Sequence, residues 1–175
     1  MMADADPRAP WHEPAMPVLD EEATWVHEAA ERFEGTSAEE LLEWALASFH
    51  PKLAISAAGG VDGMVLIDMA WRLDPDVRVF TLDTGRLPPE TYTLFEEVRD
   101  RYGIAVEFEY PDTTDVATLV NREGPNLMYR GVDLRLACCT VRKVEPLRRK
   151  LATLYAWGDY FAGPPCGNHV IVHVA

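Results

Sequence analysis

The sequence has few cysteines, fewer basic than acidic residues, and no long apolar run. Three cysteines in 175 residues cannot form a closed set of disulfides, and the N-terminal residues have neither a basic start nor an apolar core, so a secreted protein is not expected. The longest apolar runs, MVLI and VIVHV, are far shorter than the ~20 residues of a membrane-spanning helix. The sequence therefore predicts a cytoplasmic protein that does not enter a membrane.

Basic residues are outnumbered, 16 against 29 acidic residues, which gives a formal net charge of −13. Self-repulsion of this size disfavours binding to a polyanion, so a nucleic-acid-binding protein is not expected. Most of the net negative charge lies in the first 50 residues, whereas residues 122–150 carry more bases than acids. This basic segment either holds a small anion or an acidic partner, or is a solvated helix face.

The apolar content, 48% of residues, is sufficient for one folded domain. Residues 1–19 contain four prolines and no apolar periodicity, which predicts a flexible leader. Residues 20–154 are assigned to the main domain. Residues 155–175 fit neither a helix nor the preceding pattern, apart from a short strand at VIVHV, and are assigned to an atypical C-terminal tail.

The main domain is expected to begin with a pair of helices. The first runs from about Asp20 to Gly35, with acidic residues in its first turn. The second begins at a capping box formed by Ser37 and Glu40, and ends at His50-Pro51.

Short apolar runs then alternate with amphipathic segments. Strands are predicted at residues 52–58, 77–83 and 104–110, each followed by a helix. This order is typical of an α/β protein with a parallel, Rossmann-like sheet, right-handed crossovers and helices on both faces. Because ligands of such sheets bind at the carboxyl ends of the strands, the loops that follow these strands are the expected site.

The first of these loops is a Gly-rich turn with the sequence Ala58-Gly59-Gly60-Val61-Asp62-Gly63. Unpaired backbone N–H groups and the helix dipole favour an anion at such a turn. The turn has neither the Gly-Lys-Ser/Thr of a Walker loop nor the G-x-G-x-x-G of a dinucleotide site. A tight turn without a ligand explains the same residues, so the pattern alone leaves both interpretations open.

The second loop, Leu82-Asp83-Thr84-Gly85-Arg86, places a carboxylate, a hydroxyl and a guanidinium at the same edge of the sheet. These groups are suited to a nucleoside and its phosphate. The alternative is an ordinary Asp-Thr-Gly turn, which the neighbouring Gly-rich turn makes less favoured.

A vicinal cysteine pair, Cys138-Cys139, lies in the segment LACCTVRKVEPLRR. Free cysteines are often buried apolar residues. Here Arg135, Arg142 and Lys143 lie nearby in the sequence and favour the thiolate, the form that ligates iron. A buried pair and a metal or cluster site therefore both remain open.

Four segments in this order resemble the phosphoadenylyl-sulfate and adenylyl-sulfate reductase family: GGVD, LDTGRLPPETY, EGPNLMYR and CCTVRKVEPL. The resemblance covers residues 20–151. It implies an adenine nucleotide α-hydrolase-like fold with a modified PP-loop. It also implies thioredoxin-dependent reduction of adenylyl sulfate, or phosphoadenylyl sulfate, to sulfite and AMP, or adenosine 3′,5′-bisphosphate, in sulfate assimilation.

The resemblance also implies roles for particular residues. The residues that would hold the phosphosulfate are Ala58, Gly59, Gly60, Asp62 and Gly63. Those that would hold the nucleotide are Leu82, Asp83, Thr84, Gly85 and Arg86. The cysteine pair resembles the branch of the family with a 4Fe-4S cluster, in which Cys138 and Cys139 would each ligate iron and Lys143 would lie near the cluster and the substrate.

The sequence departs from the family pattern in the PP-loop and in its number of cysteines. A PP-loop usually reads Ser-Gly-Gly-x-Asp-Ser, and Ala58 and Gly63 replace its two serines. Each lost hydroxyl donor to an anion costs about 1.5–3 kcal/mol of binding free energy. A four-cysteine cluster needs a second C-x-x-C, but only Cys166 follows the pair.

The C-terminal segment Cys166-Gly167-Asn168-His169 resembles the family's Glu-Cys-Gly-Leu-His motif, whose cysteine attacks the sulfate sulfur. Pro165 stands at the glutamate position. By this resemblance Cys166 is the candidate nucleophile. The leading expectation is a reductase of this family, or a shortened copy of one.

Two other functions stay open. An ATP-pyrophosphatase of the same fold would bind pyrophosphate and magnesium at the Gly-rich turn and would not need Cys138-Cys139. A non-catalytic remnant would bind a nucleotide or a partner without turnover, and the missing cysteines favour this interpretation for the isolated chain. If the last elements of the sheet are absent, exposed apolar surface is expected to drive formation of a homo-oligomer.

Overall fold

The computed structural model describes residues 24–163 and 167–174, in two units that comprise residues 1–35 and 36–175. In the first unit the described element is the helix α1 (Thr24–Phe33), which lies within the first predicted helix. The expected leader, residues 1–19, lies outside the described residues. Across the described part of the chain, no helix has the length and apolarity needed to cross a bilayer.

The second unit begins with α2 (Ala38–Phe49), which starts at the predicted capping box. The Glu40 N–H donates to Ser37 Oγ at 3.2 Å, and the Ser37 N–H donates to the Glu40 carboxylate at 3.0 Å. These two hydrogen bonds satisfy N–H groups that the helix cannot pair internally. The helix ends before Pro51, as predicted.

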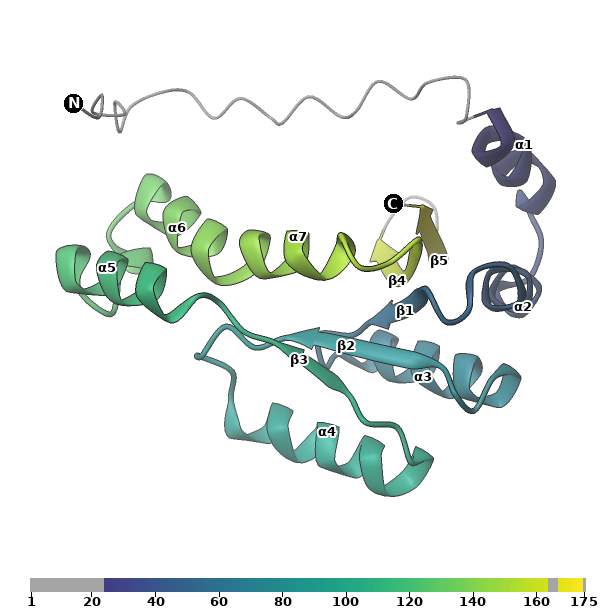
Figure 1. The fold of residues 1–175 in the computed structure, drawn as a ribbon, viewed down its shortest axis with the longest axis horizontal. Coiled ribbons are helices and arrows are strands. Elements are labelled where there is room, and N and C mark those ends of the chain that lie inside the picture. Colours follow the sequence, from purple (N-terminus) through teal and green to yellow (C-terminus); the bar gives the residue numbers. More distant parts are fainter. Residues whose placement is uncertain (1–23, 164–166, 175) are drawn as a thin grey trace. The chain divides into compact units, whose positions relative to one another are not determined.

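A five-stranded sheet with the strand order β3-β2-β1-β4-β5 forms the centre of this unit (Figure 1). Its strands are β1 (Leu53–Ser56), β2 (Arg78–Leu82), β3 (Glu107–Glu109), β4 (Ala156–Gly163) and β5 (Gly167–Val174). The first four strands are parallel, and β5 pairs antiparallel with β4. The predicted α/β fold with a parallel sheet is confirmed, with one antiparallel strand added at its edge.

Each of the first three strands is followed by a helix, as the alternating pattern predicts. These helices are α3 (Val61–Leu73), α4 (Pro89–Tyr102) and α5 (Thr113–Glu123). Pro89 opens α4, and Gly103 ends it with a φ of 73°, a conformation that glycine adopts without strain. The chain then forms a 3₁₀ turn, η2 (Leu127–Tyr129), α6 (Val132–Cys139), a π-helical turn, η3 (Thr140–Val144), and α7 (Glu145–Leu151).

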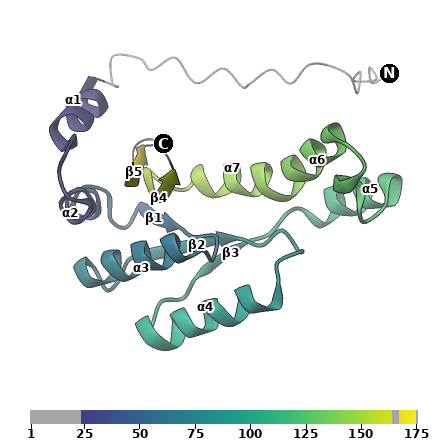
Figure 2. The same cartoon turned by 180° about the vertical axis from the view of Figure 1, so that it is seen from behind.

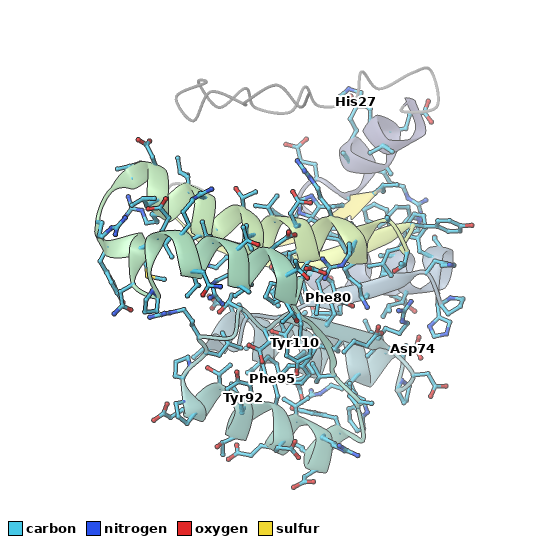
Figure 3. All side chains as sticks on the ribbon, turned by 60° about the vertical axis from the view of Figure 1, so that its left-hand side comes forward. His27, Asp74, Phe80, Tyr92, Phe95 and Tyr110 are labelled. Carbon is cyan, nitrogen blue, oxygen red and sulfur yellow. The ribbon has the colours of Figure 1, made fainter. Side chains whose placement is uncertain are left out.

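Helices cover both faces of the sheet (Figures 1 and 2). Ile55 and Val79 face one side, where they pack in a core with residues of α2, α3 and α4. Ala54 and Phe80 face the other side, in a core that includes residues of α7. Figure 3 shows Phe80 on the α7 side and Phe95 on the α4 side. The period-2 alternation of side chains along the strands therefore separates the two cores.

Residues 155–175, which the sequence sets apart as a tail with one short strand, differ from that expectation. They contribute two strands to the same sheet, and β4 lies directly beside β1. Its sequence, AWGDYFAG, has no clear apolar alternation. Gly158 of this strand packs closely on β1, since a Cβ added there would lie 2.9 Å from Ile55 Cδ1.

Candidate functional site

The loops after β1 and β2 meet at the carboxyl edge of the sheet, because these two parallel strands are neighbours. The loops also approach each other through α4. A Cβ added at Gly59 would lie 3.1 Å from Cγ2 of Thr91 in the first turns of α4. The structure therefore places at one edge of the sheet the two loops that contain the ten predicted substrate-binding residues.

The Gly-rich turn (residues 58–63) connects β1 to the N-terminus of α3. Gly59 has a φ of +82°, which favours glycine, and Gly60 caps α3 without a side-chain hydrogen bond. The first N–H groups of α3 therefore have no side-chain cap, as an anion site requires. Ala58 and Asp62 are exposed, and Gly63 packs on Ala57, with a hypothetical Cβ 3.4 Å from the Ala57 Cβ.

The LDTGR loop (residues 82–86) is shaped by the buried carboxylate of Asp83. One carboxylate oxygen accepts the Gly85 N–H at 2.8 Å, and the other accepts the Tyr92 hydroxyl at 2.9 Å. The hydrogen bond to Asp83 raises the pKa of Tyr92. Since both carboxylate oxygens of Asp83 have partners, this residue organises the loop.

Arg86 of this loop contacts the EGPN part of the chain. Its guanidinium donates to the Pro125 carbonyl at 2.7 Å and to the Asn126 side-chain oxygen at 3.1 Å. Two of the four segments that carry the family resemblance are thus hydrogen-bonded to each other, and the guanidinium of Arg86 is engaged within the protein.

Arg142 is a contact of the LDTGR loop that the sequence does not reveal. Its Nη1 donates to the Thr84 carbonyl at 2.5 Å, and its Nε is buried without a hydrogen-bond partner among the described residues. Arg142 lies in the π turn η3, a type of turn that is often found at functional sites. The available signal was its position beside Lys143 in the CCTVRK segment (residues 138–143).

Cys138 and Cys139 are free thiols at the end of α6. Cys138 is 6% exposed and packs with Leu119 and Leu127 in a small apolar cluster, whereas Cys139 is half-buried. Cys138 therefore has the surroundings of a buried apolar cysteine.

The residues present do not fit a 4Fe-4S cluster. Such a cluster is held by four thiolates. In residues 24–163 and 167–174 no group of three or more His, Cys, Asp or Glu side chains is placed to hold a metal ion. Cys166, the candidate nucleophile, lies outside the described residues.

Most bases of the segment 122–150 have partners inside the protein. Glu123 pairs with Arg122 and Arg130, and Glu145 pairs with Arg148. Arg149 donates to the Tyr110 carbonyl, and Lys150 pairs with Glu107 and Glu109. Within the described part of the chain, the side chains of the exposed Arg135 and Lys143 make no hydrogen bond or ion pair. Lys143, next to Arg142, is therefore available to an anion.

The chain matches the phosphoadenosine phosphosulfate reductase domain family over residues 52–160. It belongs to this family. The family region includes the Gly-rich turn, the LDTGR loop and the CCTVRK segment, so the resemblance carried by these motifs is confirmed. The roles of the single residues in them stay predictions.

Curated relatives agree with this assignment. The chain is 46% identical over 121 residues to adenosine 5′-phosphosulfate reductase of Pseudomonas aeruginosa strain LESB58, an alignment that covers 69% of the chain and 44% of that protein. It is 44% identical over 130 residues to 5′-adenylylsulfate reductase 3, chloroplastic, of Arabidopsis thaliana, covering 74% of the chain and 28% of that protein. The chain thus spans less than half the length of these relatives.

The fold is shared with a solved structure, the phosphate complex of phosphoadenylyl-sulfate reductase from Candida auris. The TM-score is 0.64 at 23% sequence identity, with 89% of this chain and 78% of the other covered. At this identity the likeness shows the fold, and it confirms the predicted fold class.

Proposed function

We propose that this chain carries the nucleotide-binding part of a reductase that converts adenylyl sulfate to sulfite and AMP in sulfate assimilation. Phosphoadenylyl sulfate, with adenosine 3′,5′-bisphosphate as product, is the alternative substrate. The observation that supports this most is the hydrogen bond from Arg142 to the Thr84 carbonyl, which joins the CCTVRK segment to the LDTGR loop. The names of the two curated relatives favour adenylyl sulfate.

The phosphosulfate is assigned to the Gly-rich turn. The N-terminus of α3 offers backbone N–H groups without a side-chain cap, and its dipole favours negative charge. Because Ala58 and Gly63 carry no hydroxyl, the turn offers backbone donors alone. The nucleotide is assigned to the neighbouring LDTGR loop.

Lys143 is the proposed source of positive charge near the phosphosulfate. It is exposed, and in the described residues it has no ion pair that would neutralise it. A cation at this position would stabilise the negative charge that develops on the phosphate oxygen as the sulfur–oxygen bond breaks.

The proposed reaction begins with attack of a cysteine thiolate on the sulfate sulfur. A sulfur–sulfur bond forms, the bond from sulfur to the phosphate oxygen breaks, and AMP leaves with that electron pair. One thiolate of thioredoxin then attacks the cysteine sulfur of the resulting S-sulfocysteine, and sulfite leaves with the electron pair of the sulfur–sulfur bond. The second thiol of thioredoxin displaces the cysteine thiolate, and thioredoxin becomes a disulfide. Cys166 is the candidate nucleophile, and no step passes through an iron–sulfur cluster because the described residues do not fit one.

Calorimetric titration with adenylyl sulfate tests the binding part of the proposal. Saturable binding is expected for protein that circular dichroism shows to be folded, whereas folded protein that binds neither adenylyl sulfate nor phosphoadenylyl sulfate would overturn the proposal. Pyrophosphate release from ATP would instead favour the ATP-pyrophosphatase.

Sulfite release tests turnover. Anaerobic assays with adenylyl sulfate and reduced thioredoxin are expected to yield sulfite from the unmodified chain and none from Cys166→Ala. Sulfite release that survives this substitution would exclude Cys166 as the nucleophile. Nucleotide binding without sulfite release would indicate the non-catalytic remnant.

A further inference from the structure

We propose that Arg142 is a positioning residue, which holds the backbone of the LDTGR loop in the conformation that binds the nucleotide. This inference rests on the proposed function, because the ligand concerned is the nucleotide which that function requires. The relevant observation is that Arg142 Nη1 donates to the Thr84 carbonyl at 2.5 Å across 58 residues of sequence.

The guanidinium of Arg142 also lies against Gly85. Gly85 has a φ of +70°, and a Cβ added there would lie 3.3 Å from Arg142 Nη1. The absence of a side chain at this position therefore allows the arginine to approach the loop backbone. From the other direction, Asp83 accepts the Gly85 N–H. The loop conformation is thus held by a carboxylate of its own and by a guanidinium from η3.

Arg86 connects the same loop to a second part of the helical segment. Its guanidinium donates to Pro125 and Asn126, which lie between α5 and η2. Thr84 is therefore held by Arg142, which follows α6, and Arg86 holds the segment that precedes α6. Both contacts connect the loop at the end of β2 to the helical segment, which the hydrogen bonds of the β-sheet do not position.

Two observations favour positioning over direct contact with the anion. Arg142 is half-buried and uses Nη1 for the Thr84 carbonyl, whereas the next residue, Lys143, is exposed and has no ion pair among the described residues. The exposed lysine is thus the group available to the phosphosulfate, and Arg142 acts through the backbone of the loop.

Titration with two ligands separates these roles. A positioning residue affects binding of the whole nucleotide. Arg142→Ala is therefore expected to lower the affinities for AMP and for adenylyl sulfate by a similar factor, about tenfold for one lost hydrogen bond to a charged group. Arg142→Lys keeps one donor and is expected to restore part of the affinity. Arg135→Ala, which removes an exposed base of α6, is the matched control and is expected to leave both affinities unchanged.

A loss confined to adenylyl sulfate would overturn the inference, because it would indicate direct contact with the sulfate. Equal affinities in the unmodified chain and Arg142→Ala would also overturn it. If the alanine variant does not fold, the lysine variant supports the same comparison, with a smaller loss expected for both ligands.

Hydrogen exchange in the absence of ligand tests the loop itself. The Gly85 amide is expected to exchange about tenfold faster in Arg142→Ala than in Arg135→Ala, because the loop opens more often once the Thr84 carbonyl is released. Unchanged exchange would overturn the inference whatever the ligands do. Faster exchange in a protein that binds no nucleotide would support the role of Arg142 in the loop and overturn the proposed function alone.

Discussion

Lys150 Nζ lies 3.1 Å from Oε1 of Glu109, although the lysine side chain is only 3% exposed. The same ammonium group contacts Glu107, which also accepts two hydrogen bonds from Arg78 of β2. These ion pairs fasten α7 to the edge strand β3. Because α7 continues directly from the turn that carries Arg142, they also fix the base of the segment that reaches the LDTGR loop.

Replacement of Lys150 by alanine is expected to destabilise the fold. A buried charge pair that loses one partner leaves the other without compensation, and the two glutamates here are partly exposed, so the expected loss is about 2 kcal/mol of unfolding free energy. Urea unfolding followed by circular dichroism measures it. Arg148→Ala, which removes an exposed partner of Glu145, is the control, with an expected loss of about 0.5 kcal/mol or less. Equal losses would contradict the importance of burial.

Glu107 is expected to make stability depend on acid pH. Burial acts to raise the pKa of Glu107, but hydrogen bonds from Arg78 and Lys150 outweigh it and lower the pKa. The unfolded chain therefore takes up this proton first, so the stabilisation is present above the ordinary glutamate pKa of about 4.3 and is lost as the pH falls below it. Urea midpoints between about pH 6 and pH 3 measure this. The urea midpoint of Glu107→Gln is expected to be lower at about pH 6 and to fall less towards pH 3 than that of the unmodified chain. An equal fall in both proteins would refute the assignment to Glu107.

His173 is expected to add a second pH dependence at a higher pH. Its ring stacks on Trp157 with centroids 4.1 Å apart, and burial lowers its pKa, with the charge of Asp159 opposing the shift. The unfolded chain binds the proton more readily, so stability falls as the pH drops below about 6.5. Unfolding at about pH 7.5 and pH 5.5 measures the loss. His173→Phe keeps an aromatic ring and should reduce it; an unchanged difference would exclude His173 as the cause.

Gly59 is expected to tolerate alanine poorly. Its φ of +82° is unfavourable for an L-residue, and the added Cβ would lie 3.1 Å from Thr91. The expected cost is about 1–2 kcal/mol of unfolding free energy. Gly60→Ala is the matched control, because Gly60 has an extended backbone and open space around it, and about 0.5 kcal/mol is expected there. Thermal unfolding of both variants measures the difference between the two losses of stability. Equal losses would contradict the importance of the Gly59 backbone conformation.

Much of the fold was predictable because its signals are local. The capping box of Ser37 and Glu40, the opening of α4 at Pro89 and its end at Gly103 each depend on a few consecutive residues. The same holds for the three strand–helix repeats. The family motifs also located the Gly-rich turn and the LDTGR loop correctly at the carboxyl edge of the sheet.

The amino-acid sequence was enough to establish the α/β class, the family and the loops in which a ligand is expected, because periodicity and motifs depend on residues that are close in the chain. Three features are visible only in the folded chain: β4 and β5 complete the sheet, Cys138 is buried, and Arg142 and Lys150 are joined to residues 58 and 43 positions away. These features depend on which surfaces meet after the chain has collapsed. No local sequence pattern predicts these contacts, because the two residues of each contact lie far apart in the chain.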